Sequence, residues 1–252
     1  MSLPPVVPAE AAAPSRPISP LARALAIFAN PGGAWGGLEE RSRWWIPVLV
    51  IALINIVVML PLYQRAYLPM YFDQLDSQLA SGAIDAAQAA QAEKIMQWPG
   101  MGPIVAGVTG LISVLLTLLM ALAAWFGVGF LLGAKFRYRL ALEVTAWSGL
   151  VWIPQHIAFF LMAWSQETMK GIHFGLAAFL PAMDPPSKLH AAASVLLDTV
   201  GPFNIWFLVV AVLGASALSG APRRSVAWVL VGLAVVIAVI IALITGWSTP
   251  AI

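Results

Sequence analysis

Glu143 is the acidic residue that falls inside a predicted membrane span, and it is the first candidate for chemistry. It lies near the start of the segment 140–164, four residues after Arg139. An ionisable side chain inside a membrane predicts a functional site such as a proton relay. Alternatively, Glu143 forms an interfacial salt bridge with Arg139 or with Arg137, because it lies only a few residues from the membrane surface.

A second polar group is predicted deeper in the membrane. Gln155 and His156 follow Pro154 in the segment 140–164, and Asn55 lies at a comparable depth in an earlier span. A proline-kinked helix frees a backbone carbonyl that could join them. Such a cluster could bind a polar ligand or relay protons. Interhelical hydrogen bonds that only fix the packing of the spans are the alternative explanation.

Other catalytic or metal-binding patterns are missing from the sequence. The three histidines are His156, His173 and His190, with no pair at helical spacing, and there is no cysteine. Zinc sites need three or four converging ligands, so we expect no metal. Phosphate-binding and nucleophile-elbow motifs are absent too. The sequence therefore predicts no catalytic residue, no cofactor and no enzyme activity.

Composition places the chain in a membrane. Of its 252 residues, 61% are hydrophobic and 10% are charged, whereas soluble domains carry about 25% charge. The stretch from Ile104 to Gly133 has no charged residue. We predict an all-α bundle in which the domain 46–247 crosses the membrane five times. The predicted spans are 46–63, 103–133, 140–164, 202–218 and 226–247.

The remaining segments lie outside the hydrocarbon. Residues 1–19 are proline-rich and predicted to be disordered. Residues 20–45 are expected to form amphipathic helices at the inner surface or against the protein's own loops, with Leu21, Leu25 and Phe28 on the apolar side. The outer loops are 64–102, which is expected to form a helical hairpin over the outer face, and 165–201.

The distribution of cations predicts the orientation. Nine lysines and arginines fall on the side of the N-terminus and four on the other side. By the positive-inside rule, this predicts an inner-membrane protein with its N-terminus in the cytoplasm and its C-terminus outside. The basic residues flank spans instead of forming a face, so nucleic acid is not an expected partner.

Small residues predict one face for close helix packing. Gly129 and Gly133 form a Gly-x-x-x-Gly pattern, and Ala121 lies eight residues before Gly129. Such residues let the backbone of another helix approach closely.

Two stretches resemble a known family of membrane proteins. The entry segment from Pro31 to Pro47 (PGGAWGGLEERSRWWIP) and Phe203-Asn-Ile-Trp206 with the apolar run after it resemble the bacterial branch of the Yip family. The resemblance implies five spans, a cytoplasmic N-terminus and no established catalytic residues. Eukaryotic members are Golgi and endoplasmic-reticulum proteins that bind Rab-type GTPases and carry an Asp-Leu-x-Gly-Pro signature near the first span. Here the nearest match, Asp198-Thr-Val-Gly-Pro202, lies before the fourth span with Thr for Leu, so the GTPase role is not carried over.

The leading hypothesis is a non-enzymatic scaffold or accessory subunit in the lipid bilayer. Its expected partners are other membrane proteins, including subunits of an ABC-type exporter, since some bacterial relatives act beside such exporters. Self-association into a homo-oligomer is compatible with the same hypothesis. A small-solute or ion transporter is the alternative, although no inverted repeat is evident. An intramembrane enzyme is the third and weakest hypothesis.

Overall fold

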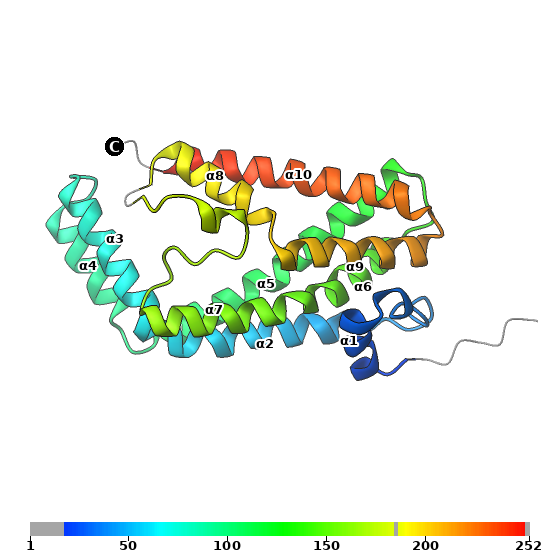
Figure 1. Cartoon of the computed structure of the whole chain (residues 1–252). Helices are drawn as coiled ribbons and strands as arrows, with labels where there is room; N and C mark the ends of the chain where they lie inside the picture. Colours follow the sequence, from blue (N-terminus) through cyan, green and yellow to red (C-terminus); the bar gives the residue numbers. More distant parts are fainter. Residues whose placement is uncertain (1–17, 184–185, 250–252) are drawn as a thin grey trace, which may run out of the picture.

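The computed structural model describes residues 18–183 and 186–249, and this part of the chain contains helices and no strand. Five helices are long and apolar enough to cross a membrane, and they lie roughly along one direction (Figure 1). The predicted fold class, an all-α bundle with five spans, is therefore confirmed. The five helical stretches are Trp45–Ala80, Met101–Leu131, Tyr138–Gln166, Pro202–Ser219 and Arg223–Ser248.

The first span continues well beyond its predicted end at residue 63. Helix α2 (Trp45–Leu62) passes through the π-helical turn η2 (Tyr63–Tyr67) directly into α3 (Leu68–Ala80). The stretch Trp45–Ala80 contains no glycine, and Gly82, which follows it, adopts a positive φ of 71°. Helix α4 (Ala86–Met96) then turns back beside α3, starting at a capping box formed by Asp85 and Gln88. We call α3 and α4 the hairpin. It extends beyond one end of the bundle (Figure 1), whereas the sequence analysis predicted a hairpin that lies over the outer face of the protein.

The second and third spans contain irregular turns. Helix α5 (Met101–Trp125) ends in the π-helical turn η3 (Phe126–Leu131). The third span consists of α6 (Tyr138–Ser148), the 3-10 turn η4 (Gly149–Trp152) and α7 (Ile153–Gln166). Pro154 lies in the first turn of α7, where a missing N–H group is tolerated. At the position of the kink expected from Pro154, the structure therefore has a 3-10 turn, which lies just before this proline.

The last three helices form the other side of the bundle. The short turn η5 (Leu176–Phe179) leads to α8 (Lys188–Thr199), which folds back along α10 (Figure 1). Helix α9 (Pro202–Ser219) follows, and α10 (Arg223–Ser248) is the last span. The turns 132–137 and 220–222 lie at the end opposite the hairpin. We call the end of the bundle with these two turns the basic end, and the opposite end, from which the hairpin extends, the hairpin end.

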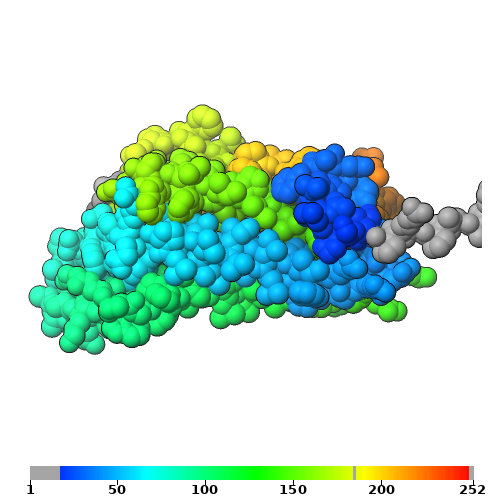
Figure 2. All heavy atoms as spheres, turned by 90° about the horizontal axis from the view of Figure 1, so that it is seen from below, coloured from blue at the N-terminus to red at the C-terminus, as the bar shows by residue number. Residues whose placement is uncertain are grey.

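The N-terminal segment packs against the basic end. Helix α1 (Pro20–Ala29) begins at Ser19, whose hydroxyl accepts a hydrogen bond from the Ala22 amide, and η1 (Pro31–Gly33) follows it. Arg23 and Ile27 are buried against the bundle, whereas the apolar side predicted from the sequence is exposed. Figure 2 shows this blue segment covering the bundle beside α2. The largest core cluster also lies near this end and includes Trp35, Trp147 and Phe207.

Candidate functional site

A polar cavity lies near the hairpin end, between the spans and the loop after α7. Its volume is about 390 Å³, and it is lined by residues of α2, α5, α7, α8, α9 and the loop. The three polar residues that the sequence grouped together, Asn55, Gln155 and His156, all line this one cavity. The other lining residues are polar Thr109, Asp198 and Asn204, and apolar Val58, Met59, Leu62, Phe159, Met169, Ile172 and Phe174.

Three of the polar side chains use their hydrogen-bond donors within their own helices. Asn55 donates through Nδ2 to the Ile51 carbonyl at 2.9 Å, and Thr109 donates to the Val105 carbonyl at 2.8 Å. His156 Nδ1 lies 2.6 Å from the carbonyl of Trp152. A carbonyl can only accept, so Nδ1 carries the proton, and in the neutral ring Nε2 is an acceptor.

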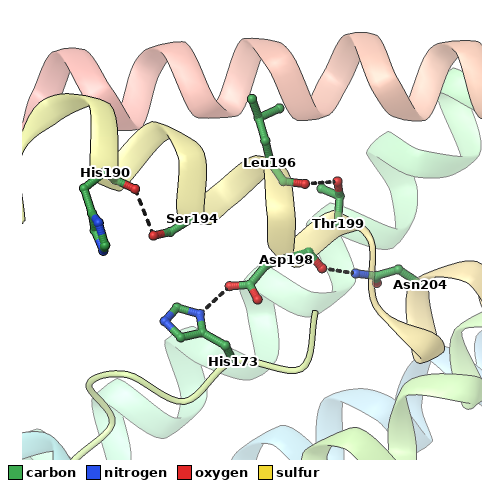
Figure 3. A network of polar contacts seen from close by, with 7 residues as sticks. All are labelled: His173, His190, Ser194, Leu196, Asp198, Thr199 and Asn204. Atoms are coloured by element: carbon green, nitrogen blue, oxygen red, sulfur yellow. Dashed lines mark hydrogen bonds and ion pairs between the residues drawn. The ribbon is translucent and has the colours of Figure 1, made fainter. Parts of the chain in front are cut away.

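Asp198, which lines the cavity, is held by a network of polar contacts (Figure 3). One carboxylate oxygen, Oδ2, lies 2.7 Å from His173 Nδ1. The main-chain carbonyl of Asp198 accepts from Asn204 Nδ2 at 3.0 Å, and Asn204 Oδ1 accepts from Trp152 Nε1 at 3.1 Å. These contacts join the loop, α8, α9 and the third span.

Two buried acceptor atoms on cavity-lining residues are left without a partner. Within the described part of the chain, Gln155 Oε1 and Asp198 Oδ1 make no hydrogen bond. Native proteins pair most buried polar atoms, and an exception calls for an explanation such as a ligand or a water. The sequence did not predict Asp198, Asn204 or Thr109 at this site, because their places depend on how α8, α9 and α5 pack around the cavity. The one sequence signal was the Asp198–Pro202 motif.

Glu143 lies elsewhere, near the basic end, and is fully buried. Its Oε1 accepts from the backbone N–H of Arg43 at 2.6 Å, and its Oε2 accepts from Trp147 Nε1 at 3.2 Å. The alternative predicted from the sequence, a salt bridge with Arg139 or Arg137, is not among the ion pairs of the described residues. The reason is that the entry segment packs onto α6 and offers Glu143 a backbone donor instead.

Arg139 and Arg23 bind the same entry segment. Arg139 donates to the carbonyls of Leu38 and Glu39 at 3.0 and 2.6 Å. Arg23 donates to the carbonyl of Gly36 at 2.8 Å and to that of Ala34, and its guanidinium lies 5.5 Å from the centre of the Trp147 ring. Burial lowers the pKa of Arg23, and the nearby Glu143 carboxylate opposes that shift. Charged side chains thus fix residues 34–43, which we call the locked segment.

The predicted Gly-x-x-x-Gly face does not form a helix-packing surface. Ala121 is buried, but a Cβ on Gly129 would lie 2.7 Å from the Phe136 carbonyl of its own chain. Gly133 is exposed, with a φ of 63° and open space around it. Gly129 lies within the π-helical turn η3, and Gly133 lies after the helix has ended, so both glycines shape the α5–α6 turn. Gly127 is the residue of this stretch that packs against α10.

Comparison with models of known protein families identifies the family to which this chain belongs. The family model for the Yip1 domain matches residues 25–245, which is most of the chain. This chain belongs to the Yip1-domain family. No curated protein and no solved structure matches it. Its placement in the bacterial branch stays a prediction.

Both the cavity and the locked segment lie within the matched range. Yip1-domain membership and five apolar helices together make the chain a multi-pass membrane protein. Among the described residues, no group of three or more histidine, aspartate or glutamate side chains is arranged to hold a metal ion. The site's chemistry is therefore that of hydrogen-bond acceptors and one carboxylate beside apolar walls.

Proposed function

We propose that this Yip1-domain protein is a non-enzymatic accessory subunit of the inner membrane that associates with other membrane proteins. The observation that carries the proposal is the locked segment together with α1. Glu143, Arg139 and Arg23 hold residues 34–43 in one conformation. A surface fixed in advance loses less conformational entropy on binding, so it suits association.

Helix α1 supplies the contact face of that surface. Leu21, Leu25 and Phe28 are 73%, 63% and 44% exposed, whereas Arg23 and Ile27 on the opposite side are almost fully buried. Since Arg23 anchors the helix, its apolar side cannot turn inward. A membrane-embedded partner with an apolar surface near the interface fits this face. An ABC-type exporter is the partner class that the sequence resemblance suggests.

Co-purification in mild detergent tests the proposal. Leu25→Ser removes apolar surface from the exposed face without touching Arg23 or Ile27. We expect this variant to stay folded but to lose a membrane-protein partner that the parent recovers. Leu189→Ser is the matched control, because Leu189 is 80% exposed on α8, far from α1 (Figure 1). Recovery of the same partners by both variants would reject the proposal.

A transporter is the second candidate, because the polar cavity could hold a solute. Four residues of the third span that lie between Glu143 and Gln155 in the sequence are each at most 4% exposed and belong to the largest core cluster: Val144, Trp147, Leu150 and Val151. Such tight apolar packing along the third span suits binding in the cavity more than conduction through the bundle. Solute or ion flux through the purified protein in liposomes, at a rate above that of empty liposomes, would favour the transporter instead.

A further inference from the structure

We propose that the cavity at the hairpin end binds an organic ammonium ion. This inference is independent of the association surface at the basic end. It rests on which hydrogen-bonding groups the cavity still offers, on one carboxylate oxygen, and on the apolar walls around them.

The buried atoms without a partner on the described cavity-lining residues are acceptors. Asn55, Thr109 and His156 each direct a donor to a backbone carbonyl four residues earlier. What they keep for a ligand is an amide oxygen, a hydroxyl lone pair and a ring nitrogen, besides the second N–H of the Asn55 amide. Gln155 Oε1 is a fourth acceptor and is buried without a partner in the described chain. A ligand that satisfies these atoms must donate hydrogen bonds.

Asp198 adds negative charge to this set. His173 occupies one oxygen of its carboxylate, and the other oxygen has no partner among the residues drawn in Figure 3. That second oxygen is also buried and unpaired among all described residues. A buried carboxylate oxygen without a hydrogen bond is costly, and a cationic donor would relieve the cost. The bond to His173 fixes the carboxylate in advance.

The apolar residues that line the cavity favour an organic cation over a metal ion as the ligand. Phe159 and Phe174 line the cavity with Met59 and Met169, and aromatic faces attract alkylammonium groups. A bare metal ion would need several oxygen ligands at short range, but the described residues contain no such acidic cluster. The volume of about 390 Å³ is in the range of small-molecule pockets. An amine with a compact apolar body matches both the acceptors and the walls.

Binding of three probes of similar shape to the full chain in detergent tests this inference. The probes are phenethylammonium, the neutral phenethyl alcohol and the anionic phenylpropionate, measured by calorimetric titration at neutral pH. We expect phenethylammonium to bind most tightly. Asp198→Asn should weaken it roughly tenfold or more, as loss of a charge-assisted hydrogen bond does. Asp76→Asn, on the exposed hairpin, should leave the affinity unchanged.

Val58→Phe is a second variant that tests the same binding site if Asp198→Asn fails to fold. It fills the cavity from α2 without touching the His173–Asp198 pair, and it should abolish phenethylammonium binding. Cyclohexylmethylammonium serves as a second amine without an aromatic ring. The inference is overturned if folded parent protein binds neither amine, if the alcohol or the acid binds as tightly as the amine, or if both cavity variants bind like the parent.

Discussion

Replacing Glu143 tests whether it is the acceptor that fixes the locked segment. Its two oxygens accept from the Arg43 amide and from Trp147 Nε1 in a fully buried place. Glu143→Ala leaves both donors without a partner, at about 1–3 kcal/mol each. Because the two bonds share one residue, their contributions do not add fully. We expect a loss of about 2–5 kcal/mol in the free energy of unfolding.

Glu143→Gln should cost less, because the amide oxygen can still accept from one of the two donors. We expect a loss of about 1–3 kcal/mol, since the amide NH₂ group then faces the other donor. Unfolding by sodium dodecyl sulfate in mixed micelles, followed by circular dichroism, measures both variants. Glu39→Gln is the control, because Glu39 is exposed on the same segment and its side chain makes no hydrogen bond in the described structure.

A double-mutant cycle makes the test specific. Trp147→Phe removes the indole donor but keeps an aromatic ring, so combining it with Glu143→Ala should cost less than the sum of the two single losses. Strictly additive losses would show that the Trp147 bond contributes nothing. If Glu143→Ala unfolded together with the parent and Glu39→Gln, the reasoning about the buried acceptor would be refuted.

Two further predictions concern topology and the α5–α6 turn. A phosphatase reporter fused after residue 252 should be active in the outer compartment, because five spans follow an N-terminus that the distribution of cations predicts to be cytoplasmic, and a cytoplasmic signal would contradict this orientation. Gly129→Ala should destabilise the protein by about 1–3 kcal/mol in the same unfolding assay, because overpacking forces backbone to shift, and its Cβ would lie 2.7 Å from the Phe136 carbonyl. Gly107→Ala is the matched control, with nothing within 4 Å of the added Cβ, and equal stability of the two variants would exclude the clash.

The five spans could be predicted because each is an apolar run long enough to cross the bilayer, a property that local sequence determines. The sequence grouped Asn55, Gln155 and His156 because of their similar predicted depth, and all three line one cavity. The partners of Glu143 could not be predicted, because they depend on how residues 34–43 pack onto α6. The π-helical turn η3 was not predicted either, because such a turn has no simple sequence signature. Its change of helical register is one reason that Gly129 and Gly133 do not lie on the expected helix face.

The hairpin is connected to the bundle at its base, through the core cluster that contains Leu68 and Met96, and this affects how the protein fluctuates. In α4 only Met96 is buried. The connections include a hydrogen bond of 2.6 Å from Tyr63 to the Met96 carbonyl and a Lys170–Asp73 pair at 4.0 Å. Segments with few buried contacts open with a small free energy, independently of global unfolding. The backbone amides of the hairpin should therefore exchange with solvent deuterium as one unit, long before those of α6 and α9.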